Sequence, residues 1–293
     1  MNRFLKKLSK FAIILLGFFL FNALINFCII KKQNLPLEKT NILIVGDSHT
    51  KRSMNPNYFN NASNICQNAE PYILTYWKIK KIFNSFTPDT IVIGFSPHNI
   101  SKFNDFKFSS SNWANEMFER SYTLLKINKL PKELKFNKKT YYKKVWKRLA
   151  IFPRKNHINY IGEYSNSKSS DLSDVKKVID RHYFKNGHKL DVSKISVSYL
   201  DSIVKLCESK KIKIILLASP LHKNYLSNIP NEISSSHKNI LNKYSNDHIT
   251  INWISNNYED SLFLDNNHLN EFGAKKFAFE VKDFLKNIEQ SKN

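Results

Sequence analysis

The sequence is poor in cysteine, with only three in 293 residues, at positions 28, 66 and 207. None of them forms a C-x-x-C pair or a spacing typical of metal ligands, which argues against a zinc module or a disulfide scaffold. Cys28 lies in an apolar stretch, and we expect Cys66 and Cys207 to be small buried residues. His182 and His188 also match no common metal-binding pattern. We therefore expect neither a metal ion nor a cofactor.

Acidic residues are also scarce: 24 Asp and Glu stand against 46 Lys and Arg, a formal net charge of +22. Such a charge often indicates a nucleic-acid partner or an anionic surface. The lysines here are dispersed, however, and no known RNA- or DNA-binding signature accompanies them. We therefore expect no nucleic-acid partner, and we keep an anionic envelope polymer or lipid surface as the partner for this charge.

The N-terminal segment has the pattern of a membrane anchor. Residues 11–30 carry no charge, and twenty helical residues match the ~30 Å hydrocarbon core of a bilayer. The basic residues before this run predict a cytoplasmic N-terminus and an exported remainder; they are Arg3, Lys6, Lys7 and Lys10. The alternative is a cleaved signal peptide, but no small-x-small cleavage site follows the run, which favours a retained anchor. Asn22 and Asn26 share one helical face and either bond a partner helix or are merely tolerated.

The stretch Asn41–Thr50, N-I-L-I-V-G-D-S-H-T, organises the rest of the chain. Its four apolar residues, 42–45, predict a short strand buried on both faces, as in a parallel sheet. Gly46 ends this strand, and a helix is expected to begin at Asp47–Ser48. A serine at such a turn projects from the carboxyl end of a strand, where backbone N–H groups can receive an oxyanion.

Strand and helix patterns then alternate along the chain, which predicts a three-layer, flavodoxin-like α/β fold with about five parallel strands and helices on both faces. The expected strands are residues 42–45, 61–66, 90–95, 212–218 and 249–254. The expected helices are residues 71–86, 192–209 and 231–246, followed by a final helix with Asn270 as its N-cap.

Residues 101–192 interrupt this alternation and predict a helical insertion, with helical patches at 113–127 and 141–149. The polar run 165–173 within it predicts a mobile loop. The insertion either contributes acceptor specificity or is a packing elaboration without substrate contact. The predicted organisation is an anchor with its basic tip (1–32), a linker (33–40) and an α/β domain (41–293).

The residues that could take part in catalysis all follow predicted strands, at the sheet edge where ligands bind in such folds. Ser48 follows the first strand, and Asp265 and His268 follow the fifth. A serine hydroxyl needs a base to take its proton, which His268 can do. Asp265, three residues earlier, can hold the other ring nitrogen and fix its tautomer. These residue types at one sheet edge make Ser48, His268 and Asp265 the candidates for a catalytic triad.

Gly46-Asp47-Ser48 and the late D-x-x-H-L-N-x-x-G-A block starting at Asp265 together resemble the first and last sequence blocks of the SGNH (GDSL-like) hydrolase superfamily. The late block is similar to envelope members related to alginate O-acetyltransferases and to the D-alanyl transfer protein of lipoteichoic acid synthesis. The resemblance implies a serine esterase or acyltransferase.

The resemblance also implies an oxyanion hole made from the N–H of Ser48, a glycine N–H after strand two and an asparagine side chain after strand three. This chain has Asn68-Ala69 at the glycine position and Ser96 at the asparagine position. Asn99 and His98, on the same loop as Ser96, are the candidates to replace the missing asparagine. For the nearby His49 and His222 we expect surface or core roles instead.

The leading hypothesis is a single-pass protein of the bacterial inner (cytoplasmic) membrane, held by residues 11–30, with its globular domain on the extracytoplasmic side. It would act on acyl esters, acetyl first among them, of an envelope glycan. The alternative is a catalytically weak or inactive accessory protein beside an acyl-transferring membrane partner. The departures in the two internal blocks favour the alternative, and the intact Ser48, Asp265 and His268 oppose it.

Overall fold

The computed structural model describes residues 1–291. The chain divides into two compact units. Unit 1 comprises Met1–Pro36 and Lys107–Asn159, and unit 2 comprises Leu37–Phe106 and Tyr160–Asn293. The N-terminal helix and the first half of the segment 101–192 thus share a unit, while residues 160–192 belong to the unit that contains the sheet.

Unit 2 is built on a five-stranded sheet in the order β2-β1-β3-β6-β7, and every neighbouring pair is parallel. The strands are β1 (Ile42–Val45), β2 (Ala62–Asn64), β3 (Thr90–Gly94), β6 (Lys213–Ala218) and β7 (Ile249–Asn252). This order confirms the predicted flavodoxin-like α/β fold. The predicted strands 61–66 and 249–254 are too long, because only residues 62–64 of the first and residues 249–252 of the second pair with a neighbour.

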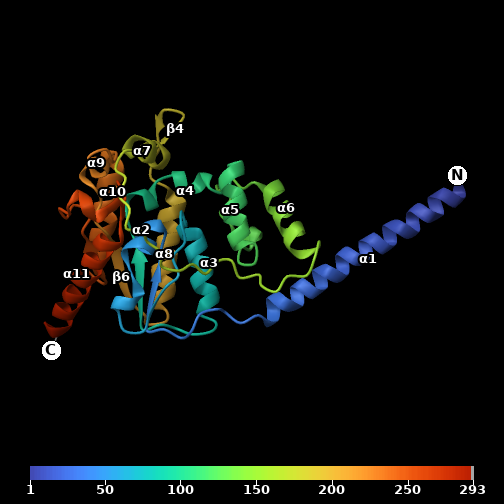
Figure 1. Cartoon of the computed structure of the whole chain (residues 1–293), viewed down its shortest axis with the longest axis horizontal. Helices are drawn as coiled ribbons and strands as arrows, with labels where there is room; N and C mark the ends of the chain where they lie inside the picture. The colour runs from blue at the N-terminus through green and yellow to red at the C-terminus, as the bar shows by residue number, and fades with distance from the viewer. Residues whose placement is uncertain (292–293) are drawn as a thin grey trace. The chain divides into compact units, whose positions relative to one another are not determined.

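Helices of unit 2 cover both sides of the sheet (Figure 1). On one side α11 (Glu271–Gln290) packs beside α2 (Ser48–Ser53), and its Phe277 and Val281 join a core with Ile44 and Val92 of the sheet. On the other side α3 (Tyr72–Ile82) packs against α8 (Lys194–Glu208). Burial on both faces explains why the central strands consist of apolar residues without alternation.

The remaining elements of unit 2 are short, apart from one further long helix, α10. They are η1 (Pro56–Tyr58), η2 (Pro97–Ile100), α4 (Phe103–Phe106), α7 (Val175–Tyr183), β4 (Phe184–Lys185), β5 (His188–Lys189), α9 (Lys223–Leu226), α10 (Asn231–Ser245), η4 (Asp260–Leu262), β8 (Phe263–Asp265) and β9 (His268–Leu269). The predicted N-cap of the final helix is confirmed, because Asn270 Oδ1 accepts the backbone N–H groups of Phe272 and Gly273.

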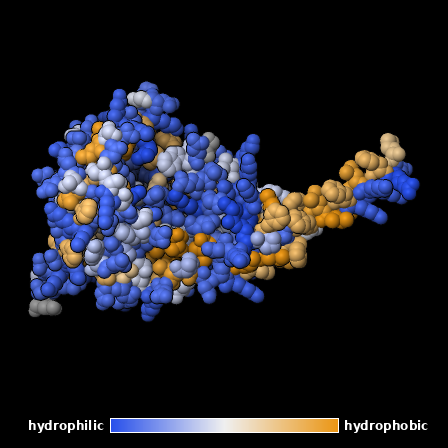
Figure 2. Space-filling model, viewed as in Figure 1, coloured by the Kyte–Doolittle hydropathy of each residue, from blue (hydrophilic) through white to orange (hydrophobic). Residues whose placement is uncertain are grey.

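Unit 1 consists of the long helix α1 (Asn2–Lys32), α5 (Ser111–Ser121), η3 (Ile127–Lys129) and α6 (Lys138–Leu149). Helix α6 packs against both α5 and α1. Rings of Phe118, Phe136 and Tyr141 form the aromatic cluster between α5 and α6. Among the described residues, α1 is the one helix long and apolar enough to cross a membrane. Figure 2 shows it as a mostly hydrophobic rod with hydrophilic residues at its N-terminal tip.

Asn22 and Asn26 are the two buried residues of α1, and they bond the end of α6 and the segment that follows it. Asn22 Nδ2 donates to the carbonyl of Ile151 at 2.9 Å. Asn26 Nδ2 donates to the carbonyls of Leu149 and Phe152 at 2.7 and 2.9 Å. Of the two roles left open by the sequence, the structure shows a bonding role, with a loop of the same chain as the partner.

Candidate active site

The candidate site lies where β1 and β3 end, at the carboxyl edge of the sheet. In the order β2-β1-β3, the chain leaves β1 toward β2 on one side, and β3 lies on the other side. Such a switch point opens a crevice beyond the strand ends, where ligands of α/β proteins bind. Ser48 opens helix α2 immediately after β1, and the loop Ser96–Asn99 follows β3.

The backbone around Gly46 brings Ser48 to this edge. Gly46 has φ of 146°, a conformation that other residues rarely adopt, so the strand can turn directly into α2. Asp47 then caps α2, its side chain accepting the N–H of His49 at 3.0 Å. Helix α2 lies so close to β3 that a Cβ on Gly94 would stand 1.8 Å from Thr50 Oγ1. Glycine at both positions therefore fixes where the serine projects.

The structure brings together the three residues of the predicted triad. His268 Nε2 lies 2.9 Å from Ser48 Oγ, although the two residues are 220 positions apart. On the other side of the ring, His268 Nδ1 lies 2.8 Å from Asp265 Oδ2 and 2.9 Å from Oδ1. Because Nδ1–H donates to the carboxylate, Nε2 is the ring nitrogen left to accept the serine proton.

The hairpin of β8 and β9 holds this arrangement. Asp265 Oδ1 also accepts the backbone N–H groups of Asn267 and His268, each at 2.9 Å. Burial raises the pKa of Asp265, but the hydrogen bond and charge of His268, aided by these two N–H groups, bring it below the usual value. Asp265 is therefore a carboxylate at neutral pH and accepts the Nδ1–H of His268.

A second aspartate–histidine pair lies beside the first and was not predicted. Asp47 Oδ2 accepts from His98 Nε2 at 2.5 Å, and both side chains are 4% exposed. Asn99 Nδ2 donates to the same oxygen at 2.7 Å, while Asn99 Oδ1 accepts the N–H of Ser96 at 2.7 Å. The predicted oxyanion candidates Ser96, His98 and Asn99 are thus all buried in a network around Asp47.

Histidine rings connect the two pairs. The ring of His49 lies 4.7 Å from that of His268 and 4.0 Å, stacked, from that of His98. His98 stacks in turn on His182 at 4.9 Å. Burial, and then the neighbouring His98 and His268, hold the pKa of His49 well below its usual value. His49 is therefore a neutral ring packed in the core, consistent with the core role expected for it.

Asn267 fixes the orientation of His49, with its Nδ2 2.9 Å from His49 Nε2. Sequence reasoning missed Asn267, although it lies inside the D-x-x-H block, and no local pattern indicates a partner 218 residues away. The remaining candidate from the sequence, His222, lies at the start of α9, where Nδ1 accepts the N–H of Asn224 and Nε2 faces Asp260 at 3.2 Å.

The loop after β2 has the backbone that the glycine of the family pattern would provide. Ala69 has φ of 55°, in the left-handed region that favours glycine. Asn68 beside it is exposed. A side-chain-bearing residue held in this region costs of order 1 kcal/mol, and such strain clusters at functional sites. In the loop after β3, by contrast, Ser96 stands at the expected asparagine position, and the nearby Asn99 is bonded to Asp47.

Residues 165–173, predicted as a mobile loop, are tied to the hairpin that carries Asp265 and His268. Asn166 Nδ2 donates to the carbonyls of Arg52 and Leu269 at 2.8 and 3.2 Å. The carbonyl of Ser167 accepts the N–H of Glu271 at 2.9 Å, and the N–H of Asp171 donates to Leu264 at 2.8 Å. This polar segment is therefore held against the hairpin and α2, which its composition did not reveal.

No protein-family model matches the sequence, and no curated protein matches it. Solved structures similar to this chain include a GDSL-like lipase from Bacteroides thetaiotaomicron, with 11% identity and a TM-score of 0.42 over 91% of this chain and 98% of that chain. A protein described as an acylhydrolase from Bacteroides fragilis has 12% identity and a TM-score of 0.40 over 90% and 94%. A protein described as a platelet activating factor from Streptococcus pneumonia has 11% identity and a TM-score of 0.42 over 94% and 99%.

Proposed function

We propose that the protein is a membrane-anchored serine esterase or O-acyltransferase that acts on acyl esters, acetyl first among them, of an envelope carbohydrate. The observation that carries the proposal is the chain of hydrogen bonds from Ser48 Oγ through His268 to Asp265. Its distances of 2.9 and 2.8 Å are those of a working nucleophile, base and orienting carboxylate.

The proposed reaction has two halves. Ser48 Oγ attacks the ester carbonyl carbon while its proton passes to His268 Nε2, and the carbonyl π electrons move to oxygen. The tetrahedral intermediate collapses, the alcohol leaves with the proton from His268, and an acyl-serine ester remains. Water or a sugar hydroxyl then gives its proton to His268 and attacks the acyl carbon, which releases Ser48 with its proton restored.

The oxyanion of that intermediate needs donors. The N–H of Ser48, at the first position of α2, is one, and the loop that places Ala69 in the left-handed region supports a second N–H there. Asn99 is a weaker candidate than its place in the chain suggests, because its amide is already bonded to Asp47 and to Ser96. Two backbone donors without a side-chain donor favour slow turnover.

The proposed anchor is α1, retained in the mature protein with its basic tip in the cytoplasm. Its internal contacts support retention: Asn26 is fully buried, its Oδ1 accepts the N–H of Arg154 at 2.9 Å, and it lies 2.9 Å from His157 Nε2. Removing α1 would leave these polar groups, and three backbone carbonyls, without their partners, which is costly in a folded protein. A cleaved leader has no reason to complete such a network.

A fluorophosphonate probe on the full-length protein in detergent tests the enzyme proposal. The wild type is expected to take the label on Ser48, and Ser48→Ala to lose both the label and ester turnover by on the order of 10³-fold or more. Ser53→Ala, a buried serine in the same helix, is the matched control and should keep the label. Faster acyl transfer to an envelope glycan than to water would make the protein a transferase.

The same experiment distinguishes an enzyme from a catalytically inactive accessory protein. If the wild type takes no label, and Ser48→Ala leaves acylation of the envelope unchanged in cells, then the catalytic proposal is wrong. The protein would then keep the fold as a partner of a membrane acyltransferase.

A further inference from the structure

The distance between Ser48 and His268 depends on how two separate elements meet. Ser48 lies on α2 and His268 on β9, 220 positions later. Asp265 belongs to the same hairpin as His268, so its hydrogen bonds turn the ring within the hairpin but do not hold the hairpin on α2. A base displaced by ~1 Å can lose ~10²-fold in rate, so the contacts between α2 and the hairpin matter for the reaction.

One buried hydrogen bond joins α2 and the hairpin directly beside the reacting pair. Asn267 Nδ2 lies 2.9 Å from His49 Nε2, and these two residues are the chain neighbours of His268 and Ser48. Two hydrogen bonds therefore cross from α2 to the hairpin at consecutive residues, and both are 2.9 Å long. Asn267 and His49 are 1% and 3% exposed, so water does not compete for their bond.

His49 is held by further contacts, so it can serve as a fixed point for the hairpin. Its backbone N–H donates to Asp47 Oδ1 at 3.0 Å, and its ring stacks on that of His98 at 4.0 Å. His98 Nε2 donates in turn to Asp47 Oδ2. The ring of His49 therefore has little freedom to follow Asn267, and the hairpin takes its position from α2.

On the hairpin side, Asn267 is coupled to His268 through Asp265. Asp265 Oδ1 accepts the backbone N–H groups of both Asn267 and His268, each at 2.9 Å. The same oxygen lies 2.9 Å from His268 Nδ1. A displacement of Asn267 would thus shift the carboxylate that orients the base.

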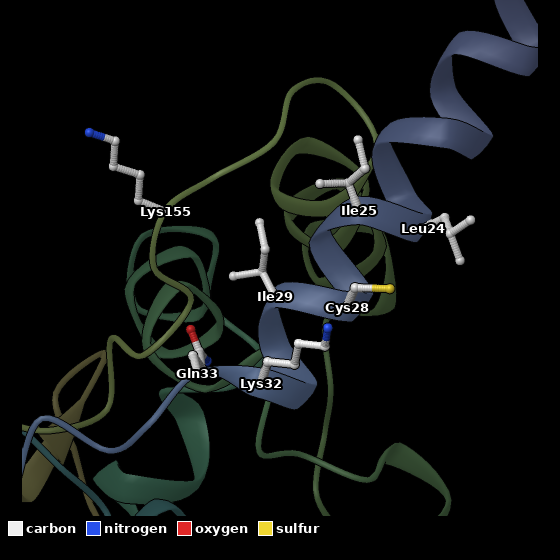
Figure 3. A pocket seen from close by; sticks show the side chains of 7 residues that line it. All are labelled: Leu24, Ile25, Cys28, Ile29, Lys32, Gln33 and Lys155. Atoms are coloured by element: carbon white, nitrogen blue, oxygen red, sulfur yellow. The ribbon is translucent and has the colours of Figure 1, made fainter.

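Every residue of this link belongs to unit 2, as the triad does. The groove of about 490 Å³ along α1 is lined by side chains of unit 1 alone and contributes nothing to the link (Figure 3). The position of the base is therefore set by contacts inside the unit that carries the sheet, where α2 packs on both β9 and α11.

The charge state of His49 suits this bond. Burial, followed by the neighbouring His98 and His268, holds the pKa of His49 well below its usual value, so the ring is neutral at neutral pH. A neutral imidazole has one nitrogen that accepts, as Nε2 does when the amide of Asn267 donates to it. A neutral His49 also does not oppose the positive charge that forms on His268, 4.7 Å away, when His268 takes the serine proton.

We infer that Asn267 and His49 are positioning residues that hold the base of the proposed triad on its nucleophile. The inference rests on the proposed esterase or acyltransferase activity and names two further residues on which its rate depends. Neither side chain is placed to contact substrate, because both are buried and the amide nitrogen of Asn267 is used by His49. Their loss should therefore lower kcat and leave KM nearly unchanged, since no contact to the bound ester is lost.

The first test measures turnover of p-nitrophenyl acetate by the full-length protein in detergent. Asn267→Ala is expected to lower kcat by about 10- to 100-fold, with KM changed by less than about threefold. Asn266→Ala is the matched control, because Asn266 is equally buried in the same hairpin but its Nδ2 donates to the carbonyl of Leu172 at 2.7 Å. This control should lower the unfolding temperature and change kcat by less than about threefold. Equal losses of kcat in the two variants would overturn the inference.

Substitution of His49 tests the same bond from α2 and remains available if Asn267→Ala fails to fold. His49→Ala removes the acceptor and should lower kcat as much as Asn267→Ala, whereas His49→Gln keeps an acceptor and should recover most of the loss. The double variant His49→Ala, Asn267→Ala should be no slower than the slower single variant, because both changes break one bond. Additive losses of kcat, or a His49→Gln protein as slow as His49→Ala, would contradict the link.

A histidine NMR signal separates this inference from the proposed function. In protein labelled with ¹³C at Cε1 of its nine histidines, the signal of His268 is assigned from its loss in His268→Gln. Ser48→Ala then shows where this signal lies without the serine partner. We expect Asn267→Ala to move the signal toward that position and Asn266→Ala to leave it in place, whether or not esters are turned over. An unmoved signal in Asn267→Ala would contradict the positioning role, whereas a moved signal in a protein that takes no phosphonate label would contradict only the enzyme.

Discussion

The two aspartate–histidine pairs at the sheet edge have the same chemical groups and different surroundings. In the outer pair, Asp265 and His268 are 35% and 11% exposed, and His268 Nε2 reaches Ser48 Oγ. In the inner pair, Asp47 and His98 are both 4% exposed, and His98 Nε2 is used by Asp47 itself. The other nitrogen of His98, Nδ1, has no hydrogen-bond partner among the described residues.

The difference teaches that orientation and access, more than the identity of the two groups, decide which pair can act as a base. The outer pair presents its free nitrogen to a hydroxyl at the open edge. The inner pair points its Nε2–H at a carboxylate, so its unprotonated nitrogen is the buried Nδ1, and the ring is closed in by stacking on His49 and His182. We therefore expect the outer pair to control activity and the inner pair to control the stability and placement of the turn that carries Ser48.

Removing each imidazole tests this contrast with the largest expected effect. His268→Gln is expected to reduce ester turnover by on the order of 10³-fold or more, because the nucleophile and base act as one unit. His98→Gln is expected to reduce turnover by less than about tenfold and to lower the unfolding temperature instead. Measurements of ester turnover and of the thermal unfolding temperature for both variants test this prediction. Equal losses of turnover at matched folding would make His98 part of the chemistry.

Removing each carboxylate should give a smaller contrast. Asp265→Asn is expected to cost less turnover than Ser48→Ala, since the base remains and only its orientation and tautomer are lost. Asp47→Asn leaves His98 buried beside a neutral amide and is expected to cost about 1–3 kcal/mol of stability. Chemical denaturation and turnover assays on both variants check these values. A more stable Asp47→Asn protein would contradict the structural role of the inner pair.

The outer pair was predictable because its information is local. Four apolar residues, a glycine and an early helix place Ser48, and the three-residue spacing of Asp265 and His268 closes a small hairpin. The final helix follows from Asn270 for the same reason. Patterns within ten residues predicted which strands form the sheet, and the resemblance of the two end blocks to a known superfamily paired Ser48 with Asp265 and His268.

The inner pair and unit 1 were not predictable, because their contacts join distant parts of the chain. His98 meets Asp47 across 51 positions, and Asn26 meets the carbonyl of Phe152 across 126. Period and composition say that a side chain is buried, but not which polar group it meets there. The shared helical face of Asn22 and Asn26 indicated a possible bonding role in the apolar stretch, but not that the partner is the end of α6 and the loop after it.

The smallest expected effect concerns His49, the ring between the two pairs. Burial lowers the pKa of His49, and it lowers the pKa of His237 to about 4. In the unfolded chain both side chains have a pKa near 6.5. Below that pH, both histidines therefore stay neutral in the folded protein while they are protonated in the unfolded chain. The unfolded state then binds more protons, and each of the two residues should lower the free energy of unfolding by up to about 1.4 kcal/mol per pH unit as the pH drops below 6.5. His49→Gln keeps an acceptor for Asn267 and should make that slope shallower. Denaturation curves at pH 6.5, 5.5 and 4.5 measure the slopes. An unchanged slope in His49→Gln would mean that His49 carries a proton in the folded state, and the two pairs would then be joined by charge.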